Sequence, residues 1–141
     1  MDVKLELVLI PVTDVDAAKA FYTEKLGFGL LVDTPVGESM RVVQVTPPGS
    51  SCSIGFGVGL LDDVKPGIYR GMHLVVTDIA AVRDELTARG VHVGDVRHLA
   101  DGAWHPGPHP ERGDYMSFAE FSDPDGNGWV LQEVGCRPSA S

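Results

Sequence analysis

The stretch Val12-Thr13-Asp14-Val15 joins an apolar run to an amphipathic one, and its pattern returns 64 residues later as Val76-Thr77-Asp78-Ile79. In each copy the apolar residues before the aspartate predict a buried strand. The aspartate is placed to cap a following helix, because its carboxylate can accept from the free amides of the first turn. A repeat this short cannot bury its own apolar faces, so two copies must pack together, either within one chain or between chains.

The residues around these two stretches extend each copy to a strand, a helix and three further strands. In the first copy the strands are expected at 5–12, 29–33, 40–46 and 53–61, and the helix at 15–26. In the second copy the strands are expected at 72–76, 91–98, 115–122 and 128–134, and the helix at 79–89. This order predicts an α+β fold built from two βαβββ modules.

One segment has no counterpart in the first copy. Residues 99–114 hold too many Pro and Gly for the interior of a helix or strand, so they predict a long loop. Such loops are often binding loops or lids, and this one carries Trp104, His105 and His109. The expected boundaries are a first module at 1–62, a linker at 63–70, a second module at 71–135 and a tail at 136–141, all in one domain.

The composition restricts the class of partner. Of the 141 residues, 43% are apolar and 22% charged, proportions at which a chain folds into a globular domain. The net charge of -9 repels phosphate backbones and anionic membranes, so neither nucleic acid nor a membrane is expected as a partner. Two cysteines, Cys52 and Cys136, are too few for a disulfide framework, and the first apolar run is too short to span a membrane. We therefore expect a cytoplasmic protein.

Three motifs, in this order and at this spacing, resemble the vicinal-oxygen-chelate superfamily. They are Ile10-Pro11-Val12-Thr13-Asp14 followed by Phe21-Tyr22 and Leu26-Gly27-Phe28, then Val75-Val76-Thr77-Asp78-Ile79 with Arg89-Gly90-Val91, and last Phe121-Ser122-Asp123-Pro124-Asp125-Gly126-Asn127. The family includes glyoxalase I, extradiol dioxygenases, fosfomycin-modifying enzymes and bleomycin-binding resistance proteins. The resemblance implies two βαβββ modules that form an incomplete β-barrel around a cavity, usually within a homodimer. The fold hosts several chemistries, so it does not by itself give the function.

The resemblance also implies where a divalent metal would be held in the metal-using members. Their ligands are a His or Gln early in each module's first strand and a Glu late in each last strand. The matching positions here are Leu7, Gly71 and Val130, and residues 53–59 contain no carboxylate. Such side chains offer no donor, so no metal and no cofactor is expected. A register shift of two would instead bring in His73 and Gln132, with a loop histidine (His98, His105 or His109) to complete a site.

Several residues are candidates for contact with a ligand, each with a structural alternative. His73 can act as an acid or base or line a cavity wall, and Tyr115 can present its hydroxyl or cover a strand edge. Trp104 can stack on a flat ligand or pack its own loop against the domain. The expected ligand-binding residues are His73, Gln132, Trp104, His105, Leu7, Phe56 and Val130, and catalytic roles would fall to His73 and Tyr115.

These features favour a glyoxalase/bleomycin-resistance-like protein that binds an organic, partly aromatic small molecule in a metal-free cavity, as a homodimer. The alternative is a lyase, isomerase or ring-modifying enzyme of secondary metabolism that uses acid/base residues. A third interpretation is a divalent-metal-dependent enzyme of the glyoxalase or dioxygenase type. The sequence does not decide between a binder and an enzyme.

Overall fold

The computed structural model describes residues 1–137, so the end of the expected tail, from 138 on, lies outside the described residues. The chain divides into two compact units. Unit 1 comprises Met1–Tyr69 together with Asp123–Asn127, and unit 2 comprises Arg70–Ser122 and the chain from Gly128 on. Each unit holds one of the two sequence repeats.

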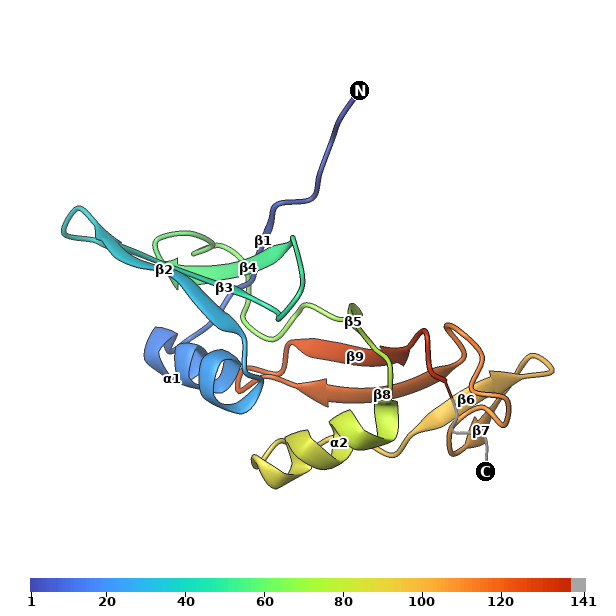
Figure 1. The fold of residues 1–141 in the computed structure, drawn as a ribbon. Coiled ribbons are helices and arrows are strands. Elements are labelled where there is room, and N and C mark those ends of the chain that lie inside the picture. The colour runs from blue at the N-terminus through green and yellow to red at the C-terminus, as the bar shows by residue number, and fades with distance from the viewer. Residues whose placement is uncertain (138–141) are drawn as a thin grey trace. The chain divides into compact units, whose positions relative to one another are not determined.

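Unit 1 is a four-stranded sheet with a helix on one face (Figure 1). Its elements are β1 (Leu7–Leu9), α1 (Val15–Ala20), the π-helical turn η1 (Phe21–Lys25), β2 (Gly29–Val36), β3 (Met40–Thr46) and β4 (Ser53–Val58). The strand order is β1-β4-β3-β2, with β1 parallel to β4 and the other pairs antiparallel. β1 is shorter than the predicted strand at 5–12.

The expected helix cap and the expected apolar stripe are both present in unit 1. The Asp14 carboxylate accepts from the amide of Ala17 at 3.0 Å, which satisfies a free donor of the first turn of α1. The Tyr22 ring lies 5.7 Å from that of Phe56, and Val43 and Val45 on β3 are fully buried beside them. The core of unit 1 therefore lies between the helix and one face of the sheet.

The turn Asp123–Asn127 belongs to unit 1 although it follows β8 in the chain. The Asp123 carboxylate accepts from the Tyr22 hydroxyl at 2.7 Å, and from the amide and side chain of Asn127, each at 2.9 Å. The Asn127 side chain also donates to the Pro11 carbonyl at 3.1 Å. All these groups are buried. The motif Asp-Pro-Asp-Gly-Asn therefore forms a buried hydrogen-bond network with Tyr22 and Pro11, in addition to making a turn.

Unit 2 repeats the plan with one additional strand. Its elements are β5 (Met72–Val76), α2 (Ile79–Ala88), β6 (Arg97–Ala100), β7 (Ala103–Pro106), β8 (Ser117–Ser122) and β9 (Gly128–Glu133), in the sheet order β5-β9-β8-β6-β7. The Asp78 carboxylate caps α2 by accepting from the amide of Ala81 at 3.1 Å. Trp129 and Leu131 on β9 and Ile79 and Leu86 on α2 are buried, so this core too lies between helix and sheet.

Two sequence predictions in unit 2 are wrong in part. The segment 99–114, expected to be a loop throughout, begins with a β-hairpin in which Ala100 pairs with Ala103. The turn residues Asp101 and Gly102 have φ of 54° and 73°, as a two-residue Asp-Gly hairpin turn requires. The strand expected at 91–98 begins only at Arg97; Val91 and Val93 are buried without forming a strand.

The element order otherwise agrees with the expected pair of βαβββ modules, and neither sheet closes on itself. Among the described residues, no helix has the length and apolar character that crossing a membrane would require.

Candidate functional site

The sheet of unit 2 has one face covered by α2 and one open face, and the strands alternate between them. On β9, Trp129, Leu131 and Glu133 are buried on the helix side, whereas Val130 and Gln132 are only half-buried on the other side. The strand register places further side chains on this second side. We call it the open face of unit 2; it carries His73, Val75, Arg97, Trp104, Phe118, Glu120, Val130 and Gln132.

The register brings three of the expected ligand-binding residues close together. His73 lies opposite Val130 across the β5–β9 pair, and Val75 lies opposite Gln132. On the other side of β9, Gln132 lies opposite Phe118. His73, Val130 and Gln132 thus form one continuous strip of the open face.

A cluster of two aromatic side chains, Trp104 and Phe118, lies at the β6–β7 end of the same face. The Trp104 ring packs edge-to-face on Phe118 with centroids 5.3 Å apart, and the Arg97 guanidinium lies 3.9 Å above the Trp104 ring. Arg97 also pairs with Glu120 at 3.1 Å. Trp104 is nevertheless 47% exposed, so a large part of the indole is available for stacking.

Hydrogen bonds fix the orientation of the polar groups beside this face. The Nδ1 atom of His73 lies 2.6 Å from the carbonyl of Gly71, and because a carbonyl only accepts, Nδ1 carries the proton and Nε2 the lone pair of the neutral ring. Tyr115 has a φ of 65°, is 57% exposed, and accepts at its carbonyl from the Gln132 side chain at 3.4 Å. Tyr115 therefore borders the polar part of the face.

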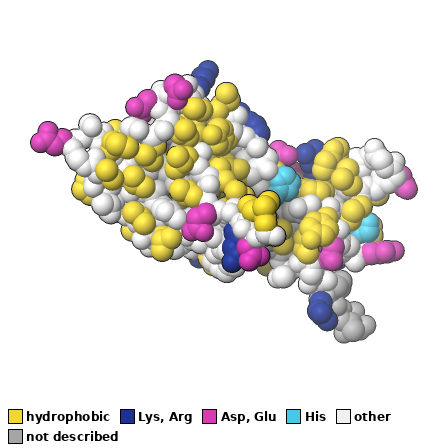
Figure 2. Space-filling model, turned by 90° about the horizontal axis from the view of Figure 1, so that it is seen from above, with side chains coloured by type: hydrophobic (Ala, Val, Ile, Leu, Met, Phe, Trp, Pro, Cys, Tyr) yellow, Lys and Arg dark blue, Asp and Glu magenta, His cyan; other side chains and the backbone are white. Residues whose placement is uncertain are grey.

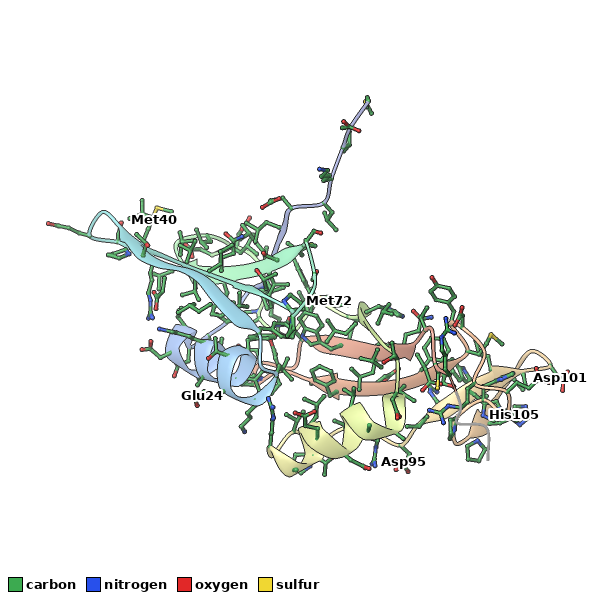
Figure 3. All side chains as sticks on the ribbon, viewed as in Figure 1. Glu24, Met40, Met72, Asp95, Asp101 and His105 are labelled. Carbon is green, nitrogen blue, oxygen red and sulfur yellow. The ribbon has the colours of Figure 1, made fainter. Side chains whose placement is uncertain are left out.

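His105 does not lie with Trp104. Because neighbouring strand residues point to opposite sides, His105 joins a separate group on the other side of the hairpin. Its ring stacks on His98 at 5.3 Å, and His109 meets His98 edge-on at 5.6 Å. Figure 3 shows His105 on this hairpin, near Asp101 at its tip.

The two expected ligand-binding residues of unit 1 lie on opposite faces of its sheet. Phe56 is buried against Tyr22 on the helix side, so it belongs to the core and is not available to a ligand on the other face. Leu7 contacts the Gly55 side of β4, on what we call the open face of unit 1. That face is largely aliphatic; besides Leu7 it carries Leu9, Val36, Met40 and Val42, and hydrophobic side chains gather over unit 1 in the space-filling view (Figure 2).

The side chains present do not fit the family's divalent-metal site. Leu7, Gly71 and Val130 occupy three ligand positions, and none has a donor. Within residues 1–137 no group of three or more His, Cys, Asp or Glu side chains is arranged to hold a metal ion. His73 and Gln132 share a face, but the two alone do not make a closed site.

A buried ion pair behind the open face was not found by sequence reasoning. Glu133 is fully buried on the helix side, where it accepts from the Arg112 guanidinium at 2.6 and 2.7 Å and from the amide of Ile79 at 2.9 Å. Burial alone would raise the pKa of Glu133, but the hydrogen bonds from Arg112 and Ile79 outweigh it and hold the pKa below its ordinary value. Since Arg112 comes from the loop after β7, this pair fixes the loop that carries Tyr115.

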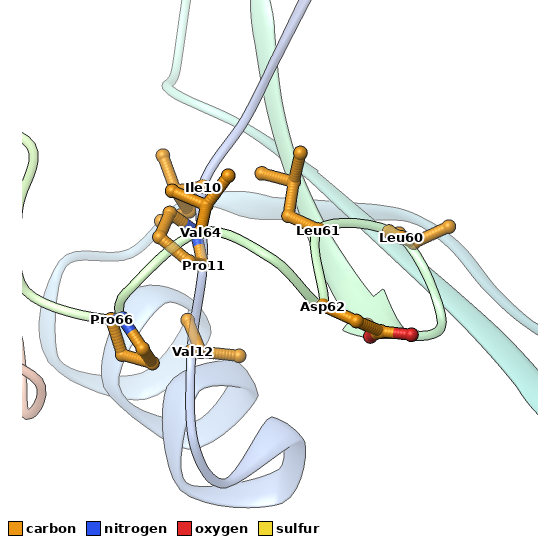
Figure 4. A pocket seen from close by; sticks show the side chains of 9 residues that line it. Ile10, Pro11, Val12, Leu60, Leu61, Asp62, Val64 and Pro66 are labelled. Atoms are coloured by element: carbon orange, nitrogen blue, oxygen red, sulfur yellow. The ribbon is translucent and has the colours of Figure 1, made fainter.

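Unit 1 contains a small pocket at the end of β1 (Figure 4). Its volume is about 220 Å³, polar atoms make up most of its exposed wall, and Asp62 is its one charged lining residue. The lining residues are Ile10, Pro11, Val12, Gly57, Leu60, Leu61, Asp62, Val64 and Pro66. None of the residues expected to bind ligand lines it.

Comparison with known proteins finds a matching family and several similar structures. The sequence model of the Glyoxalase/Bleomycin resistance protein/Dioxygenase superfamily matches residues 4–131. TnmS3, an antibiotic-binding protein from Streptomyces sp. CB03234, is 34% identical, with a TM-score of 0.73 over 94% of this chain and 96% of that one. A glyoxalase/bleomycin resistance protein from the same organism is 35% identical, with a TM-score of 0.70 over 92% of this chain and all of that one.

Two further similarities extend the range of organisms. A superfamily member from Sphaerobacter thermophilus DSM 20745 is 32% identical, with a TM-score of 0.73 over 94% of this chain and 98% of that one. The uncharacterized protein YetH of Bacillus subtilis is 24% identical over 89% of this chain and 94% of its own length. The resemblance inferred from the sequence motifs, and with it the α+β fold class, is thereby confirmed.

Proposed function

Because this chain belongs to the Glyoxalase/Bleomycin resistance protein/Dioxygenase superfamily, we propose that it binds an organic, partly aromatic small molecule on the open face of unit 2. The observation that carries the proposal is the combination on one face of an exposed aromatic group with oriented polar groups. Trp104 and Phe118 offer a stacking surface, and His73 and Gln132 offer a lone pair and an amide beside it. A 34% identical neighbour is described as an antibiotic-binding protein, which supports an antibiotic-like ligand.

In this proposal no metal takes part in binding, since the side chains at the family's metal positions have no donors. The ligand-contacting residues are His73, Trp104, Phe118, Val130 and Gln132, with Tyr115 at the border. Phe56 and His105 are left out because they point elsewhere. The protein acts in the cytoplasm and as a homodimer.

The proposal is tested by titrating the protein with bleomycin and with daunorubicin, followed by calorimetry. At least one is expected to bind saturably. Trp104→Ala is expected to weaken that binding by up to about tenfold, since one stacking contact contributes about 0.5–1.5 kcal/mol. Leu31→Ala, at an exposed apolar position of unit 1, is the matched control and should leave the affinity unchanged. Equal affinities for the wild type and Trp104→Ala would contradict the placement of the site.

If the protein only binds its ligand and does not convert it, the ligand should be recovered unchanged. Mass spectrometry of the ligand after long incubation checks this. A new product would instead support an acid/base enzyme, the second candidate, for which the orientation of His73 is the specific observation. In that case the rate should depend on pH and be lost in His73→Gln, while ligand affinity is largely kept.

A further inference from the structure

The pocket at the end of β1 lies where the hydrogen-bonded ladder between β1 and β4 stops. The last bond of that ladder runs from the Ile10 amide to the Gly55 carbonyl, at 2.8 Å. In a regular parallel pair the next bond would run from the Gly57 amide to the Ile10 carbonyl. Within residues 1–137 that bond is not made, and the strand pairing ends at Leu9 opposite Gly55. The two segments separate here, and Ile10 and Gly57 both line the space between them.

The turn Asp123–Asn127 explains why the segments separate. The Asn127 side chain donates to the Pro11 carbonyl at 3.1 Å. The Asp125 carboxylate accepts from the hydroxyl of Thr13 at 2.6 Å and from its amide at 3.2 Å. These bonds direct the chain after Ile10 toward the turn instead of along β4. The pocket is therefore built by unit 1 alone and is held open by hydrogen bonds within it.

The separation leaves a buried acceptor without a donor. Ile10 is only 2% exposed, and within residues 1–137 its carbonyl accepts no hydrogen bond. A buried carbonyl of this kind requires a donor from water or from a ligand. Donors are scarce in the wall, because Pro11 and Pro66 have no amide hydrogen and the Val64 amide already donates to the Leu61 carbonyl at 3.2 Å. The pocket is thus richer in acceptors than in donors.

The side chains of the pocket add one negative charge to an otherwise aliphatic lining. Asp62 is the only lining residue whose side chain has a polar atom. Figure 4 shows the segment 60–62 on one side of the pocket and the segment 10–12 on the other. A volume of about 220 Å³ equals the space of roughly seven waters in the liquid, which is enough for a small organic molecule. The net charge of -9 further favours a cation over an anion.

We propose that this pocket binds a small organic cation, a primary ammonium group carried on a short aliphatic chain or ring. The ammonium donates to the Asp62 carboxylate and to the free Ile10 carbonyl, and the hydrocarbon part packs against Val12 and Leu60. An ammonium group suits this wall because it has three donors and no acceptor. The inference concerns unit 1 alone and does not rest on the ligand proposed for unit 2.

The test titrates the full chain with cyclohexylammonium, whose size matches the pocket, and follows amide resonances by NMR. Saturable shifts are expected at Gly57 and Leu61, which line the pocket. Cyclohexanol and cyclohexanecarboxylate keep the ring but not the cation, so each should bind at least about tenfold more weakly. Equal affinities for cyclohexylammonium and cyclohexanol would overturn the proposal, and so would the absence of saturable shifts, since the pocket would then hold water only.

A pair of neighbouring carboxylates provides the matched variants. Asp62→Asn keeps the shape of the side chain but removes its charge, and should weaken binding of cyclohexylammonium about fivefold. Asp63→Asn makes the same change at an exposed residue that does not line the pocket, and should leave the affinity unchanged. Both side chains are exposed, so neither variant is expected to disturb the fold. An unchanged affinity in Asp62→Asn, or equal losses in the two variants, would overturn the assignment of Asp62 as the counter-ion.

Discussion

The sheets of unit 1 and unit 2 share a scaffold but differ on their open faces. Both begin with a strand parallel to their last one, both order the four common strands alike, and both cover one face with a helix capped by aspartate, Asp14 or Asp78. The open face of unit 1 is largely aliphatic, whereas that of unit 2 carries Trp104, Phe118 and oriented polar groups. The repeated residues therefore specify the scaffold, and residues present in one repeat only specify the chemistry.

The two units also differ in how they accommodate a buried carboxylate. Asp123 in unit 1 is satisfied by neutral donors, namely the Tyr22 hydroxyl and the amide groups of Asn127. Glu133 in unit 2 is satisfied by the guanidinium of Arg112 and a helix-start amide. Removing a hydrogen-bond donor should therefore lower the unfolding free energy more in unit 2, because there the Glu133 carboxylate loses its counter-charge.

The largest expected effect is that of Arg112→Ala. The change leaves the fully buried Glu133 without its counter-charge, which costs about 3–5 kcal/mol of unfolding free energy. Urea denaturation at pH 7 measures it. Arg89→Ala removes an exposed guanidinium paired with Glu85 and should cost less than about 1 kcal/mol. Similar losses in the two variants would show that the Arg112 pair does not hold unit 2 together.

The next effect concerns the carboxylate of unit 1. Tyr22→Phe keeps the buried ring but removes a 2.7 Å hydrogen bond to Asp123, and should cost about 1–3 kcal/mol. Tyr115→Phe, at an exposed ring, is the control and should lie within about 0.5 kcal/mol of wild type. If Tyr22→Phe were as costly as Arg112→Ala, the distinction between neutral and charged donors would fail.

Much of this scaffold could be predicted from the sequence, and the reasons are local. The caps at Asp14 and Asp78 depend on one side chain and the next few amides, so spacing alone predicts them. The β6–β7 hairpin was missed because the abundance of Pro and Gly after it outweighed the Asp101-Gly102 turn, a short-range signal that could have been recognised.

The candidate site was predicted only in part. Strand alternation was sufficient to place Gln132 and Glu133 on opposite faces. It could not give the pairing of Glu133 with Arg112, because those residues lie 21 positions apart and the loop between β7 and β8 has no regular period. Nor could it separate Phe56 from a ligand-facing position, since that requires knowing which face the helix covers.

A smaller effect is expected when the pH is changed, because the loss of unfolding free energy in Arg112→Ala should depend on pH. In wild type the pKa of Glu133 lies below its ordinary value of 4.5, so its stabilisation is present above about that pH and is lost as the pH falls. Without Arg112, burial should raise that pKa, and the carboxyl then becomes neutral at a higher pH. The difference in unfolding free energy between wild type and variant should thus become smaller as the pH falls from 7 to 4. Paired urea titrations measure this difference, and a constant difference would mean that the penalty does not arise from the charge of Glu133.

The smallest expected effect compares two glutamines directly. Gln132 lies on the open face of unit 2, and Gln44 lies on the open face of unit 1, where β3 pairs with Gly55 of β4. If the ligand contacts unit 2 through its polar strip, Gln132→Ala should weaken binding about fivefold, because a single neutral hydrogen bond contributes about 1 kcal/mol. Gln44→Ala should change affinity by less than about twofold, and calorimetry with the bound antibiotic distinguishes the two. Equal losses would show that Gln132 makes no specific contact with the ligand, and the assignment of the ligand to the open face of unit 2 would then be wrong.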